Sequence, residues 1–234
     1  MNMQKIILAI IISCISGTIF AGIKFTPIQL YLGDKGRQRS TTVVVESTGF
    51  TKSKIFEISA LNWSQNEKGE DVLVEDKTLM FNPKVFELKP ESKQIVRVGF
   101  AQQFAPSELE KEKTWRVIFN EVTPVADDES INFQFKFSLP LFVGKQYKTD
   151  LGVQLKTDNN VAKVDVINKA NSHVQITDIK LVDKKDNEIL SKSFNSYLLA
   201  GHEYSFDLGA VNIKDKSNVK VKIKTDKDGS LLEY

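Results

Sequence analysis

Two cations on neighbouring predicted strands are the residues best placed for chemistry. Apolar and polar side chains alternate from Ile131 to Leu139, which predicts a strand over residues 130–143, and residues 114–122 are expected to form the preceding strand of a hairpin with it. If the turn is centred on Ala126, Arg116 lies directly opposite Lys136. Opposed like charges are unfavourable unless an anion sits between them, and the guanidinium fork of arginine binds a carboxylate well. This register predicts a carboxylate site; the alternatives are a solvated pair relieved by a nearby acid, or a hairpin slipped by one residue.

The other face of the same hairpin is aromatic. Its facing pairs would be Trp115 with Phe137, Val117 with Phe135, Phe119 with Phe133 and Glu121 with Ile131. Three phenylalanines on one face are more aromatic bulk than a half-solvated strand needs, and Pro140 is typical of a sheet edge. An aromatic edge strand invites other chains to pair with it. The stretch is therefore either an ordinary core strand of a β-sandwich or a surface offered to a partner.

The sequence contains no recognisable catalytic or metal-binding pattern. His173 and His202 are the only histidines, and both are expected at strand ends without a neighbouring acid or nucleophile. The acids at 127–129 lack the spacing of a calcium loop, and neither a nucleophile elbow nor a phosphate-binding loop occurs. We therefore expect a protein that is not an enzyme and that needs neither a cofactor nor a metal.

Residues 1–21 are typical of a secretory signal peptide. Lys5 supplies the positive charge, residues 6–12 form an apolar core, and Ala21 ends a plausible cleavage site. A membrane anchor and a lipoprotein signal at Cys14 are the alternatives, although the apolar run is short for a membrane span. Cleavage would remove the only cysteine, so the mature protein is expected to be exported, without disulfides and not inserted in a membrane.

Composition and pattern indicate an all-β protein. Charges of both signs are mixed along the chain and the formal net charge is +2, which argues against a nucleic-acid surface. The expected strands lie at residues 23–32, 41–46, 54–63, 79–82, 94–100, 114–122 and 130–143, and then at 151–156, 162–168, 174–182, 188–190, 202–208, 219–224 and 231–233. All six prolines precede residue 141. We therefore expect two tandem immunoglobulin-like β-sandwich domains, at residues 22–144 and 145–234.

One segment carries a family resemblance. Residues 81–98, FNPKVFELKPESKQIVRV, together with the last two strands of the first domain, resemble periplasmic pilus-assembly chaperones of the chaperone–usher pathway. The resemblance implies a periplasmic protein that lends its last first-domain strand to incomplete fimbrial (pilin) subunits and passes them to an outer-membrane usher. Ile131, Phe133, Phe135 and Phe137 would fill the groove of the subunit. The free protein could also cover this edge by self-association.

The resemblance is greatest to the archaic subgroup of these chaperones. The best-known members carry anchoring cations on the first and last strands; in this chain the first position falls near Ile28 and Gln29 and the last on Pro140, so neither is a cation. In the archaic subgroup the cations lie on the two final strands, which implies that Arg116 and Lys136 hold the C-terminal carboxylate of the subunit. Arg97 is interpreted as structural, paired with an acid such as Glu112. The competing hypothesis is a structural or adhesive, pilin-like tandem sandwich.

Overall fold

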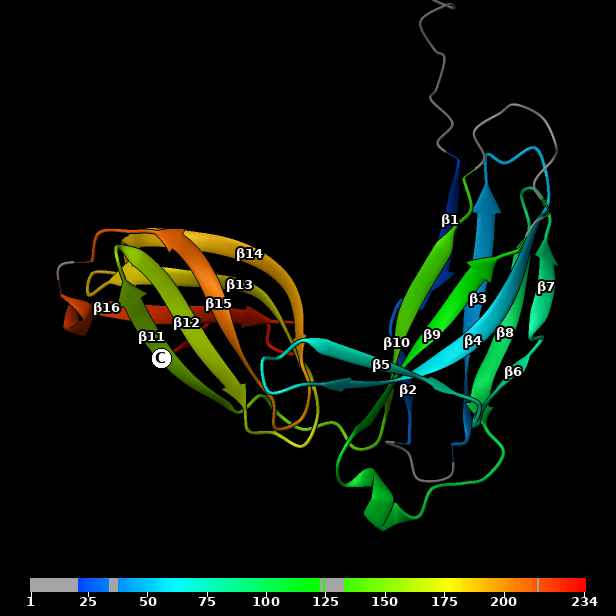
Figure 1. Ribbon diagram of the computed structural model, residues 1–234, viewed down its shortest axis with the longest axis horizontal. Coiled ribbons are helices and arrows are strands. Elements are labelled where there is room, and N and C mark those ends of the chain that lie inside the picture. The colour runs from blue at the N-terminus through cyan, green and yellow to red at the C-terminus, as the bar shows by residue number, and fades with distance from the viewer. Residues whose placement is uncertain (1–20, 34–37, 123, 125–132, 214) are drawn as a thin grey trace, which may run out of the picture.

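The computed structural model describes residues 21–33, 38–122, 124, 133–213 and 215–234. Their strands form four sheets, two in each half of the chain, and the two halves lie at an angle like the arms of a bent rod (Figure 1). This confirms the expected all-β fold with two tandem sandwiches. Two single 3₁₀ turns, Pro106–Leu109 and Lys216–Asn218, are the helices among these residues, and neither could cross a membrane.

The described part of the N-terminal sandwich contains ten strands. One sheet has the order β1 (Gly22–Thr26), β3 (Ser40–Thr48), β8 (Lys93–Phe100) and β6 (Leu79–Asn82); the other has β2 (Leu30–Leu32), β10 (Lys136–Val143), β9 (Lys113–Glu121), β4 (Lys54–Gln65) and β5 (Asp71–Asp76), with β7 (Val85–Leu88) also pairing with β4. The strand expected at 23–32 is two strands in different sheets, because Pro27 lacks the N–H that a continuous ladder needs.

Seven strands are found in the described residues of the C-terminal sandwich. One sheet has the order β11 (Leu151–Asp158), β12 (Val161–Asn168) and β15 (Glu203–Ala210). The other sheet has the order β14 (Glu188–Leu198), β13 (Val174–Asp183), β16 (Val219–Thr225) and β17 (Leu232–Glu233). Inward-facing apolar side chains, mostly aliphatic here and with more aromatic rings in the first domain, fill the space between the two sheets.

A long hairpin connects the two sandwiches. Strands β4 and β5 extend beyond the first core towards the second domain (Figure 1). The Gln65 side chain donates to the carbonyl of Tyr197 (2.8 Å) and accepts from the N–H of Leu199 (2.9 Å). At the tip, a Cβ on Gly69 would lie 2.6 Å from the carbonyl oxygen of Glu203, so only glycine permits this approach. The sequence pattern gave no signal for β5, because its side chains are exposed on both faces.

Candidate functional site

The hairpin of β9 and β10 has a different register from the one expected. Pro140 pairs with Arg116, and Lys136 pairs with Asn120. The expected opposition of Arg116 and Lys136 is therefore wrong. The two cations lie four positions apart along the ladder, about 13 Å at roughly 3.3 Å per residue, so they do not face each other across it.

The sequence could not resolve this shift. Moving the register by four residues, an even number, keeps every side chain on its original face, so the alternation of apolar and polar residues is equally satisfied. The shift brings Phe137 opposite Phe119 and Leu139 opposite Val117. The predicted aromatic face is present, but its pairings are different.

The outer edge of β10 is open over half its length. Among the described strands, β2 is the only one on that side, and it pairs only with Leu141–Val143. The N–H of Glu121 donates to the carbonyl of Phe135 (2.8 Å), so odd-numbered residues of this strand bond to β9. The backbone groups of Lys136 and Ser138 therefore point away from β9, at an edge where a further strand could bond. Pro140, which has no N–H, also falls on this outward side.

The three phenylalanines that precede and begin β10 differ in burial. Phe137 packs against Phe25 (ring centroids 4.8 Å apart) and is half-buried, so it belongs to the seam between the two sheets. Phe135 stacks on Phe137 at 5.7 Å and is also half-buried, whereas Phe133 is 81% exposed. The strand expected from residue 130 begins at Lys136, and Ile131 lies outside the described residues.

A buried ion pair holds the base of this segment. Lys54 Nζ lies 2.9 Å from Glu121 Oε1; the Glu121 side chain is almost inaccessible to solvent and that of Lys54 is largely buried. The other oxygen, Glu121 Oε2, accepts the backbone N–H of Phe135 at 3.0 Å. The Lys54 ammonium also lies over the rings of Phe50 (5.1 Å) and Phe135 (4.9 Å). This arrangement fixes the point at which the chain enters the ladder, and the sequence gave no indication of it.

Arg116 lies in the cleft between the two domains. Its guanidinium is stacked over the ring of Trp63 at 3.6 Å and lies 5.5 Å from the ring of Tyr197, which belongs to the second domain. Asp71 Oδ2 is 3.7 Å away. Burial lowers the pKa of Arg116 and the charge of Asp71 opposes that effect, so the group remains a cation. A hollow of about 390 Å³ adjoins these four side chains.

Glu112 bonds to a histidine at the junction of the domains. His173 Nδ1 lies 2.9 Å from both oxygens of the Glu112 carboxylate, and the His173 backbone N–H donates to it at 2.8 Å. Both side chains are fully buried. The expectation that Arg97 pairs with Glu112 is therefore wrong. The expectation that His173 has no neighbouring acid is also wrong, because its partner Glu112 is distant in sequence and comes from the other domain.

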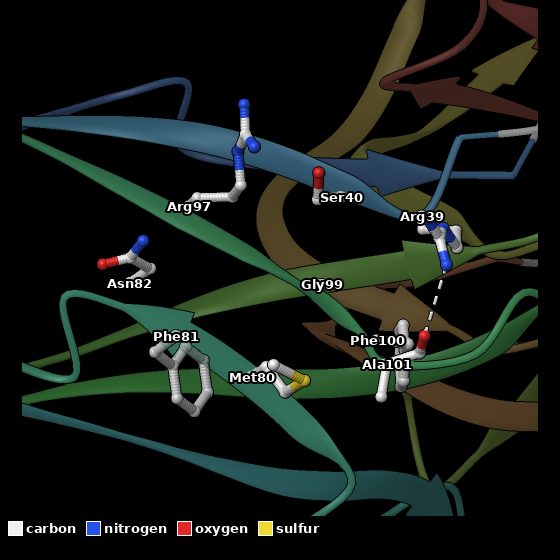
Figure 2. A pocket seen from close by; sticks show the side chains of 9 residues that line it. All are labelled: Arg39, Ser40, Met80, Phe81, Asn82, Arg97, Gly99, Phe100 and Ala101. Carbon is white, nitrogen blue, oxygen red and sulfur yellow. Dashed lines mark hydrogen bonds between the residues drawn. The ribbon is translucent and has the colours of Figure 1, made fainter.

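Arg97 instead belongs to a surface hollow on the first sheet. The hollow, about 330 Å³, lies over β3, β8 and β6. Arg39 and Arg97 are on one side of it and Met80 and Phe81 on the other (Figure 2). Gly99 forms part of its lining, and a Cβ there would collide with the β3 backbone. The described residues that line the hollow include two arginines and no acid, so it is suited to an anionic partner with apolar side chains.

Nothing in the described residues forms a metal site. No group of three or more histidine, cysteine, aspartate or glutamate side chains converges among them.

Comparison with known proteins places these features in context. Residues 36–144 match the family profile described as "Pili and flagellar-assembly chaperone, PapD N-terminal domain". Comparison with curated proteins gave no match.

Several solved structures share the fold of nearly the whole chain. A chain of the CsuC–CsuE chaperone–tip adhesion subunit complex, from the archaic Csu pili of Acinetobacter baumannii, has a TM-score of 0.66 at 17% identity, covering 92% of this chain and 97% of that one. The YadV chaperone gives 0.62 at 14% identity, covering 91% and 98%. A chain of the Salmonella enterica SafA pilin–SafB chaperone complex gives 0.59 at 12% identity, covering 93% and 98%.

Proposed function

We propose that this chain is a periplasmic chaperone that binds fimbrial subunits by donor-strand complementation and delivers them to an outer-membrane usher. The match of residues 36–144 and the shared two-domain fold support a pilus-assembly chaperone. Such a role requires no catalysis and no cofactor. The signal-like segment at residues 1–21 supports export to the periplasm.

The observation that carries the proposal is the open edge of β10. Among the described residues no strand pairs with the outward backbone groups of Lys136 and Ser138, which lie beside a row of phenylalanines that becomes more exposed towards Phe133. In β-augmentation, main-chain hydrogen bonds provide affinity and alternate side chains provide specificity, and donor-strand complementation is an established form of it. A subunit that lacks a strand would bond to this edge and receive Phe133, Phe135 and Ile131 in its groove. Phe137 would lie at the boundary between the two cores.

Arg116 is proposed to anchor the C-terminal carboxylate of the subunit. It is held rigidly on Trp63, it retains its charge, and it adjoins a hollow in the cleft. Lys136 is exposed on the same face of the sheet, four positions farther along. It would contact the bound subunit upstream of that carboxylate. The two cations thus have separate roles and together define the path of the added strand.

The hollow beside Arg97 is proposed to face the usher. It lies on the sheet β1-β3-β8-β6, at the end far from the seam between β1 and β10. It therefore remains accessible while a subunit occupies the open edge. Its two arginines suit an acidic segment of the usher.

Co-expression with a fimbrial subunit tests the proposal. The mature chaperone and the subunit should co-purify from the periplasm as a one-to-one complex, and amides of Lys136 and Ser138 should become protected from hydrogen exchange. A complex that forms without protection at these amides would contradict donor-strand complementation.

The same experiment separates the alternative of a pilin-like or adhesive protein. Such a protein would assemble with copies of itself or bind a surface, and would not keep a separate subunit soluble. Self-association through the open edge would be displaced by the subunit if the chain is a chaperone.

A further inference from the structure

We infer that Asp71 is a built-in substitute for the carboxylate that Arg116 binds, and that an incoming carboxylate must displace it. The inference builds on the proposed function, because it concerns the same cleft. Arg116 is a buried cation whose side chain is only 16% exposed, and a buried charge is costly without a partner. Among the described residues, Asp71 is the acid within ion-pair distance of it.

The contact is geometrically weak. The Arg116–Asp71 distance is 3.7 Å, longer than the 2.7–2.9 Å of a charge-assisted hydrogen bond. The Asp71 side chain is 43% exposed, and its other oxygen accepts from Gln65 Nε2 at 3.3 Å. Asp71 thus neutralises the cation without using the full hydrogen-bonding capacity of the guanidinium. A second carboxylate could approach from the adjoining hollow and bind more tightly.

Displacement would involve the side chain of Asp71 and not the backbone. Asp71 begins β5, directly after the hairpin tip that Gly69 fits against the second domain. Gln65, opposite it on β4, is bonded to Tyr197 and Leu199. Because the hairpin is held at both places, only rotation of the Asp71 carboxylate towards solvent can free the guanidinium. Trp63 keeps Arg116 in position during the exchange.

Substitution of Asp71 by asparagine tests the inference directly. The probes are N-acetyl-phenylalanine and its primary amide, titrated into the full mature protein labelled with ¹⁵N. The measured signal is the side-chain Nε–Hε resonance of Arg116, assigned with Arg116→Lys. Because the Asp71 side chain is 43% exposed, its ion pair with Arg116 is worth no more than about 1 kcal/mol, which corresponds to about fivefold in affinity. Asp71→Asn should therefore lower the Kd of the acid about two- to fivefold and leave that of the amide unchanged.

Glu75→Gln is the matched control. Glu75 lies on the same strand and the same face, but pairs with Lys77, so its loss should leave both affinities unchanged. Unchanged or weaker binding of the acid by Asp71→Asn would overturn the inference. Weaker binding would show that Asp71 instead positions Arg116 for the carboxylate. Subunit capture is measured separately. If the wild-type protein captures subunits but Asp71→Asn does not bind N-acetyl-phenylalanine more tightly, only the inference is defeated. If Asp71→Asn binds N-acetyl-phenylalanine more tightly but neither the wild type nor any variant captures a subunit, the exchange is supported and the chaperone function is defeated.

Discussion

Phe137 and Phe25 contact each other across the seam between the two sheets of the first domain, with ring centroids 4.8 Å apart. Phe137 therefore stabilises the free protein, although it lies on the face that would enter a subunit. Phe135 is half-buried like Phe137, whereas Phe133 is 81% exposed. The aromatic row is thus divided between the protein's own core and a partner.

Phe133 and Phe137 should separate binding from folding. Phe137→Ala should lower the free energy of unfolding by about 2 kcal/mol, below the roughly 3–5 kcal/mol of a fully buried phenylalanine. Phe133→Ala should change it by less than about 0.5 kcal/mol, yet reduce subunit capture at least about tenfold, since burial of a phenylalanine contributes roughly 1.5–3 kcal/mol. Urea titration and capture assays measure both. Ile95→Ala, an exposed aliphatic on the other sheet, is the control. Normal capture by Phe133→Ala would contradict this division.

Arg116 should contribute to both stability and binding. Arg116→Ala exposes Trp63 and should lower the free energy of unfolding by about 1 kcal/mol, the scale of a cation–π contact. Loss of one partner of a desolvated charge pair should weaken subunit capture by about 2–5 kcal/mol. Arg116→Lys keeps the charge but loses the planar stack, and should be intermediate. Lys136→Ala, an exposed cation on the neighbouring strand, should leave stability unchanged and weaken capture less. Equal losses from both alanine variants would argue for a shared anchor.

The Lys54–Glu121 pair should control the start of β10. Glu121→Gln leaves Lys54 buried without its counter-ion, so we expect a loss of about 2–3 kcal/mol in unfolding free energy. Hydrogen exchange at the Phe135 amide should accelerate, because its acceptor is weakened. The control is Glu57→Gln, which removes the exposed ion pair with Lys84 at the same sheet. Unaltered exchange at Phe135 in Glu121→Gln would show that the ladder alone fixes this residue.

Glu112 and His173 should set the angle between the domains. Glu112→Gln removes a buried carboxylate that binds the imidazole and the backbone of His173, and should cost about 3 kcal/mol. Small-angle X-ray scattering should show a larger radius of gyration because the junction loosens. Glu188→Gln, an exposed acid of the second domain, should leave the scattering unchanged. A stable variant with unchanged scattering would transfer this role to the β4–β5 hairpin.

Arg97 should matter for delivery and not for capture. Arg97→Ala should retain subunits normally but weaken binding of the loaded chaperone to the usher, because the hollow loses one of its two cations. Lys93→Ala, an exposed cation on the same strand, is the control. Binding of the loaded Arg97→Ala chaperone to purified usher gives the result, and an affinity equal to that of wild type would exclude this face.

The sequence by itself determined the fold class, the strand faces and the aromatic row. Alternation with a period of two specifies which side chains point inward, and it correctly placed Phe135 and Phe137 together against the core of the first domain. Local pattern cannot report the register of a hairpin when the shift is even, so the tertiary structure decided that Arg116 opposes Pro140.

Only the tertiary structure decided which charges meet. His173 and Glu112 are 61 residues apart, and Tyr197 joins Trp63 around Arg116 from the other domain. Such contacts depend on how two separately folded sandwiches pack, which no local periodicity encodes. The exposed strand β5 was invisible for a related reason: a strand that buries neither face leaves no alternation to read, and its pairing with β4 alone defines it.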